Sequence, residues 1–137
     1  MANTFTAAFA QTPKTATAVA TGVATITDDA PANTVLLVTA GSNGAILTRL
    51  TAIPRATVTA SSLCLWISSD GGTTKRLVNS VLMSAATVNT TTAIAVTTFS
   101  TYTETTPLRL AAADRLYVGS QVALAGGIVF TAEYTDY

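Results

Sequence analysis

Short runs of alternating apolar and polar residues, separated by turn-forming residues, constrain this 137-residue chain more than any other feature. The run Ser62 to Ser68 leads into Asp70-Gly71-Gly72, and a second alternating run follows it. Alternation with a period of two places apolar side chains on one face of a half-buried strand. No stretch of more than ten residues shows the 3.6-residue period of an amphipathic helix. The pattern therefore predicts an all-β fold.

The runs and their turns predict an antiparallel β-sandwich or jelly roll of eight or nine strands. Asn43-Gly44 predicts a tight hairpin between two of these strands, and Pro54 ends the second of them. Residues 15–137 are expected to form one β-sandwich domain, preceded by an N-terminal arm over residues 1–14. The expected strands cover 16–27, 34–40, 45–53, 62–68, 73–83, 90–103, 107–110, 116–123 and 128–134.

Composition bears on the surface of this domain. The chain has 28 Thr and 25 Ala, only 10% charged residues and a formal net charge of zero. Thr is β-branched and suits a strand, where its hydroxyl can face solvent or a neighbouring chain. With so few charged residues, the chain has no basic surface that would attract nucleic acid or an anionic membrane. We therefore expect neither as a partner. A net charge near zero also permits close association with other subunits.

Few residues offer catalytic or metal-binding chemistry. There is no histidine, and the single cysteine, Cys64, lies in an alternating apolar run typical of a small buried side chain. Glu104 and Glu133 are a conceivable carboxylate pair, but their spacing does not single them out. Asp28-Asp29 lacks the further oxygen ligands that calcium requires. We therefore expect no enzyme activity, and we predict no catalytic residue, cofactor or metal site.

The glycines of Asp70-Gly71-Gly72 raise the question of a phosphate-binding loop. Such a loop precedes a helix and continues with lysine and a hydroxyl residue in fixed order, whereas here a strand-like run follows. Asp-Gly suits the positive φ angles of a tight turn, so a hairpin is favoured. Trp66, which lies in the strand before this turn, is expected in the core or in an interface.

The N-terminal segment carries two large apolar residues, Phe5 and Phe9, among small and polar ones. Pro13 follows and cannot donate to a strand ladder. One interpretation is a frayed terminus. The other is an arm that docks its phenylalanines on a neighbouring molecule, with Phe5, Phe9, Pro13 and Lys14 as the proposed contact residues.

The order of several motifs resembles a group of small tailed-phage and prophage virion proteins. The similarity covers about residues 34–137 and consists mostly of turn and strand patterns. The motifs are "AGSNGAILTRLTA" (40–52), "LCLWISSDGGTTKRL" (63–77), "TPLRLAAADRLYVGSQ" (106–121) and the C-terminal "IVFTAEYTDY".

This resemblance implies a structural role in a bacteriophage virion, as a head decoration (cement) protein. Such a protein would sit on the outer surface of the capsid, commonly as a homotrimer, bind the major capsid protein and reinforce the shell by bridging neighbouring capsomers. In that role the segment from Phe5 to Lys14 would contact the capsid or a neighbouring protomer. Two alternatives stay open: a receptor- or glycan-binding module of a tail fibre or spike, and a small tail or head-completion protein.

Overall fold

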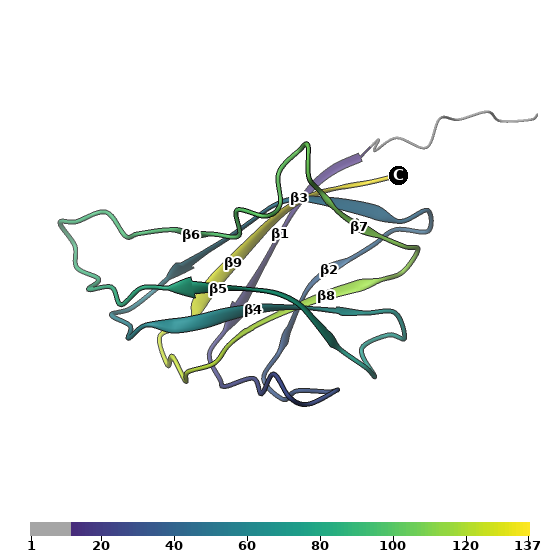
Figure 1. Ribbon diagram of the computed structural model, residues 1–137. Coiled ribbons are helices and arrows are strands. Elements are labelled where there is room, and N and C mark those ends of the chain that lie inside the picture. The colour runs from purple at the N-terminus through teal and green to yellow at the C-terminus, as the bar shows by residue number, and fades with distance from the viewer. Residues whose placement is uncertain (1–11) are drawn as a thin grey trace, which may run out of the picture.

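The structure, a computed structural model, describes residues 12–137. Over this range the chain forms nine β-strands and no helix, arranged as two facing sheets (Figure 1). The strands are β1 (Thr12–Ala20), β2 (Val35–Thr39), β3 (Ala45–Pro54), β4 (Ser61–Ser68), β5 (Arg76–Met83), β6 (Thr97–Thr98), β7 (Leu108–Leu110), β8 (Arg115–Ser120) and β9 (Ile128–Asp136).

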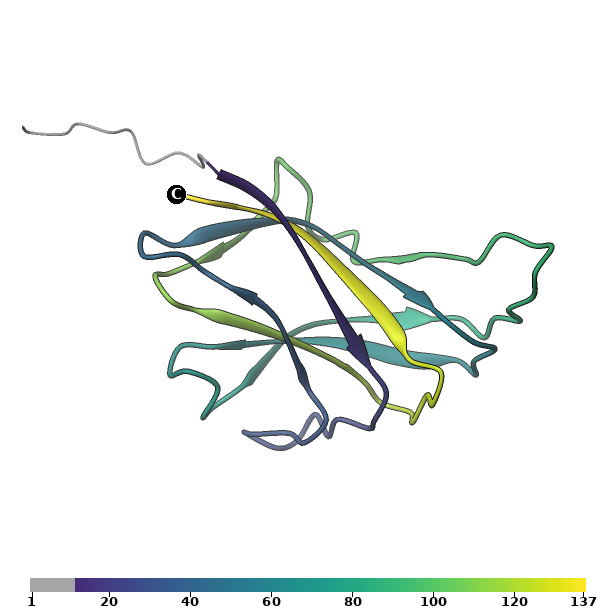
Figure 2. The same ribbon diagram turned by 180° about the vertical axis from the view of Figure 1, so that it is seen from behind.

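The two sheets are entirely antiparallel. The sheet that we call sheet A has the order β1-β9-β3-β6, and β7 also pairs with β3. Sheet B has the order β2-β8-β4-β5. Seen from behind, β1 runs along one edge of sheet A beside the C-terminal strand β9 (Figure 2). The predicted antiparallel β-sandwich is confirmed, whereas the jelly roll stays a prediction.

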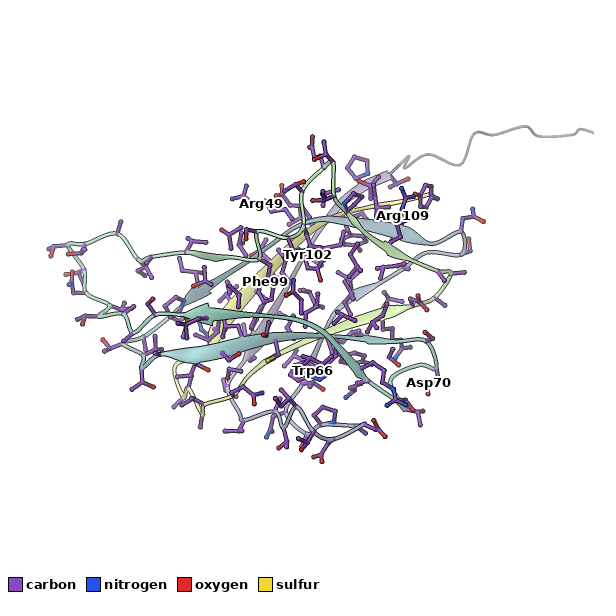
Figure 3. The ribbon with its side chains drawn as sticks, in the orientation of Figure 1. Arg49, Trp66, Asp70, Phe99, Tyr102 and Arg109 are labelled. Carbon is purple, nitrogen blue, oxygen red and sulfur yellow. The ribbon has the colours of Figure 1, made fainter. Side chains whose placement is uncertain are left out.

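A single apolar core fills the space between the sheets. It forms because alternate residues of each strand point inward. Phe99 and Tyr102, from the segment after β6, fill the space beside these strands and are 1% and 7% exposed (Figure 3). The largest fully buried side chains of this core also include Leu47, Leu50, Leu63, Leu65, Leu116, Ile128 and Phe130.

Three strands contain an extra residue that changes which side chains face the core. The pairing registers skip Leu37 in β2, Thr48 in β3 and Val78 in β5. Simple alternation predicts Leu47 and Leu50 on opposite faces of their strand, and this is wrong: both are fully buried. A β-bulge inserts one unpaired residue and so reverses the alternation beyond it.

The turn at Asn43-Gly44 forms, but it does not join a hairpin. Gly44 has φ +87°, and its N–H donates to the Gly41 carbonyl over 3.1 Å. The strands on either side belong to different sheets, since β2 pairs with β8 and β3 pairs with β9. The predicted hairpin is therefore wrong: the turn carries the chain from one sheet to the other.

The predicted long strand over residues 90–103 is reduced to the two residues of β6. The chain between β5 and β6 instead projects from the end of the sandwich (Figure 1). Asn89 accepts hydrogen bonds there from the N–H and the hydroxyl of Thr91, at 3.0 and 3.2 Å. Such local side-chain bonds compete with strand pairing, so β-branched composition alone overpredicts strands.

Candidate interaction surfaces

The structure places two of the four predicted contact residues. Pro13 and Lys14 lie in β1, whereas Phe5 and Phe9 lie outside the described residues. The predicted boundary between arm and domain, after residue 14, therefore falls inside a strand. Pro13 is opposite Thr135 of β9, and β1 is an edge strand, where a residue without an N–H is tolerated.

Lys14, near the start of β1, forms an ion pair with Asp136, the last residue of β9. Its Nζ lies 2.6 Å from Oδ2 of Asp136, a residue that is only 7% exposed. The other carboxylate oxygen accepts the Gly41 N–H over 3.1 Å. The Lys14 hydrogen bond, followed by the one from Gly41, lowers the pKa of Asp136, and Asp136 in turn raises the pKa of Lys14. Within the described chain, Lys14 therefore serves the fold of its own molecule.

Two neighbouring hollows lie beside β3 and β9 of sheet A, and Lys14 lines the smaller one. They measure about 570 and 290 Å³, and both are lined by Thr48, Glu104 and Glu133. The fold thus brings together the two glutamates that sequence spacing did not single out. Glu133 lies on β9, and Glu104 lies in the segment between β6 and β7.

The chemistry of these hollows is that of an open polar surface. Nε of Arg49 lies 3.7 Å from Oε2 of Glu133, and the two side chains are 60% and 51% exposed. Arg49 points outward from β3 at this surface (Figure 3). Carboxylates so accessible to water keep their hydration, so the arrangement offers hydrogen bonds to a polar ligand.

The glycine-rich turn between β4 and β5 satisfies its own polar groups. Oδ1 of Asp70 accepts from the Ser68 hydroxyl at 2.9 Å and from the Thr74 N–H at 2.8 Å, and these bonds lower the pKa of Asp70. The Gly72 N–H donates to the Ser68 hydroxyl over 2.8 Å. Gly71 and Gly72 have φ +75° and +97°, and the two strands pair. The prediction of a hairpin rather than a phosphate loop is confirmed.

A row of large side chains crosses the outer face of sheet B. Leu36 is opposite Tyr117, which is opposite Trp66, which in turn is opposite Leu77. Trp66 is 0% exposed, although it faces away from the main core (Figure 3). Tyr117 belongs to the same separate cluster and is 8% exposed. Within the described residues the Trp66 indole N–H has no hydrogen-bond partner. Trp66 thus lies in a second, smaller core.

The connection between β1 and β2, residues 21–34, provides the cover of this second core. Ala24 packs in the cluster, and its N–H donates to the Ser120 carbonyl over 2.9 Å. At the other end, the Lys75 N–H donates to the Asp29 carbonyl over 2.6 Å. Cys64 belongs to the same cluster at 1% exposure, as predicted for a small buried side chain, and burial raises its pKa.

Beyond this cover, the edge strand β5 leaves apolar side chains in solvent. We call Leu77, Val78 and Leu82 the β5 patch; they are 41%, 41% and 68% exposed. Simple alternation predicts Leu77 and Leu82 on opposite faces of their strand, so the sequence does not indicate this surface. The bulge at Val78 brings them to the same face, and the sequence gives no signal for that bulge.

A second group of exposed apolar residues lies where β1 and β8 end. We call Val19, Val23 and Val122 the end patch; they are 37%, 42% and 36% exposed. Val23 bridges to Ser120, whose hydroxyl donates to the Val122 carbonyl over 2.8 Å. The two patches therefore lie on different structural elements.

Residues 12–137 contain no helix long and apolar enough to cross a membrane, and they gather no group of three or more potential metal ligands. In comparisons with known proteins, no family model, no curated protein and no solved structure matches the chain. Its function must therefore be inferred from its surfaces.

Proposed function

We propose that this protein is a bacteriophage head decoration protein that binds the major capsid protein on the outer surface of the shell. In this role it assembles with itself as a homotrimer and bridges neighbouring capsomers. It acts through surface contact, without catalysis and without a cofactor. The observation that carries the proposal is the presence of two exposed apolar patches, the β5 patch and the end patch, on a molecule of zero net charge.

A bridging protein needs at least two contact surfaces, one for its own copies and one for the shell. Exposed apolar groups on a soluble protein commonly mark such contacts. Sparse charge lowers the cost of contact, because unpaired ions are expensive to desolvate at an interface. Repetition of a modest contact over a lattice then gives tight attachment through multivalency.

The strand order supports the jelly roll within this proposal. With the short β7 set aside, β1-β9-β3-β6 faces β2-β8-β4-β5, an order in which the chain repeatedly crosses between the sheets. Jelly rolls of eight strands recur in viral capsid domains and in lectins. Because one fold hosts many functions, the order supports the proposal without deciding it.

The test is the number of copies of this chain per purified phage particle, measured by quantitative mass spectrometry against the major capsid protein. A decoration protein repeats with the capsid lattice, so hundreds of copies are expected. About a dozen copies or fewer would assign the protein to the tail, since tail components follow ring symmetry. Its absence from particles would overturn a virion role.

The glycan-binding alternative has one observation in its favour. The hollow of about 290 Å³ places Tyr134, which is partly exposed, beside Glu104 and Glu133. Sugar sites combine an aromatic side chain with polar groups of this kind. Binding to a glycan array that is lost in Glu133→Gln would support this alternative, with the matched change Asp29→Asn as the control.

A further inference from the structure

We propose that two copies of this chain associate through their β5 strands, in a two-fold antiparallel contact centred on Ser80. The contact would join the two four-stranded B sheets into one continuous sheet of eight strands. It does not rest on the proposed capsid role: the homotrimer is proposed for the capsid surface, where the lattice brings three copies together, whereas two free molecules would form this two-fold contact in solution.

The first argument is the free edge of β5. This strand pairs with β4 on one side and has no strand partner on the other within the described chain. Ser80 is exposed, and its N–H donates over 2.8 Å to Oδ1 of the adjacent Asn79 rather than to β4. The free side therefore presents a backbone donor that only a local side chain satisfies. Such an edge is a template for pairing with another chain.

The second argument is the register that the bulge creates. Leu82 is opposite Ser62 of β4, Ser80 is opposite Cys64, and Leu77 is opposite Trp66. Cys64 and Trp66 belong to the second core on the outer face of sheet B, so the three β5 residues also face outward. In an antiparallel ladder, residues on one face direct their N–H and C=O groups to the same side. Ser80 directs its N–H away from β4, so Leu82 and Leu77 direct theirs the same way. These three residues define the free ladder edge.

The third argument is the self-complementarity of this edge. A two-fold axis at Ser80 places Ser80 opposite Ser80 of the second copy. Because Val78 is the extra residue of the bulge and is skipped in the pairing, Leu82 then lies opposite Leu77 of the second copy. The contact occurs twice, as an isologous interface requires. It brings together side chains that are 68% and 41% exposed in the single molecule. Cross-strand apolar pairs of this kind stabilise sheets.

The fourth argument is the absence of charge repulsion. Arg76 is the only charged residue of β5, and it stands at the beginning of the strand. In the two-fold arrangement it comes opposite Met83 of the second copy. The two arginines then lie at opposite ends of the contact. Like charges directly opposite each other would destabilise the pair, and this register avoids them.

Sedimentation velocity from roughly 10 to 500 μM tests the contact, because one strand pair buries too little surface for tight binding. We expect a reversible dimer for the wild type. Leu82→Lys should weaken it about tenfold or more, because the lysine replaces apolar burial twice per dimer. Leu36→Lys is the matched control: it charges a leucine that is 43% exposed on β2, at the opposite edge of sheet B from β5, and should leave association unchanged. Thermal unfolding verifies that both variants fold.

Cysteine cross-linking tests the register independently. Under mild oxidation Ser80→Cys should form disulfide-linked dimers, because the two residues 80 are directly opposite. Ser84→Cys, at an exposed serine just beyond the strand, should not. The native Cys64 is buried and should not react.

Three results would overturn the proposal. They are a wild-type protein that stays monomeric throughout this range, an assembly that Leu82→Lys leaves intact, and equal cross-linking of the two cysteine variants. Because copy number in particles is a separate measurement, failure here leaves the capsid proposal standing, and failure of the capsid proposal leaves this one standing.

Discussion

The edge strand β1 of sheet A and the edge strand β5 of sheet B differ in how they meet solvent. On β1, Pro13 lacks an N–H and Lys14 adds a charge, and the large apolar side chain of Val19 is 37% exposed. On β5 there is no proline, and charge is confined to the first residue. Natural sheets protect their edges with lysine, proline or bulges against unwanted pairing.

This difference assigns the two edges different roles. The lysine at β1 pairs with Asp136 of the neighbouring strand β9, so its charge is tied to the fold of its own molecule. On β5 the bulge at Val78, a device that often protects an edge, instead gathers Leu77 and Leu82 on one face. An edge with exposed apolar groups and little charge is suited to association. We therefore expect mutations near β1 to change stability and mutations on the outer side of β5 to change association.

The largest effect should come from Met83, the last residue of β5. Met83 is 2% exposed, and Met83→Ala should lower the free energy of unfolding by about 2–5 kcal/mol, because it leaves a cavity in the core. Leu82→Ala, its matched control, should change that energy by less than about 0.5 kcal/mol, since the side chain is mostly in solvent. Urea denaturation at low protein concentration measures both. Equal losses would show that the outer side of β5 is not free.

An intermediate effect is expected for the ion pair between Lys14 of β1 and Asp136 of β9. Folding lowers the pKa of Asp136. Its ionised carboxylate therefore stabilises the folded state at pH values above the unfolded pKa of about 4. This stabilisation is lost as the pH falls through the lower pKa of the folded state. Asp136→Asn should therefore destabilise the protein at pH 7, by on the order of 1 kcal/mol, and much less at pH 3. Unfolding free energies at the two pH values measure this.

Asp28→Asn serves as the control for this comparison, since Asp28 is an exposed acid in the cover of the second core. It should leave the pH dependence of the wild type in place. If the Asp136 variant lost the same stability at both pH values, the effect would come from packing rather than from the ion pair with Lys14.

The sequence predicted the fold class because alternation and turn residues act locally. It did not predict which strands pair, since this depends on contacts between distant segments. Strand β9 lies between β1 and β3, and this placement joins Arg49 to Glu133 and Lys14 to Asp136. The two glutamates of the sheet A hollows came together in the same way, through strand order rather than through spacing.

The bulges set the second limit on prediction from sequence. At Thr48 one extra residue put both Leu47 and Leu50 in the core, and at Val78 another put Leu77 on the same face as Leu82. A shift of one residue moves every later side chain to the other face of a strand. Trp66, by contrast, could be expected in a core from its size, although the cover that buries it comes from a loop.

The smallest effect should come from Arg76, the only charge on β5. Its Nη1 lies 2.6 Å from Oδ1 of Asp29, but the side chains are 67% and 73% exposed. Exposed ion pairs contribute little, so Arg76→Ala should change the free energy of unfolding by about 0.5 kcal/mol or less, and high salt should remove the difference. A double-mutant cycle with Asp29→Ala isolates the pair. A coupling energy between Arg76 and Asp29 well above 1 kcal/mol would contradict this expectation. It would mean that the ion pair holds residues 21–34 over the second core more strongly than the backbone hydrogen bond between Lys75 and Asp29 does.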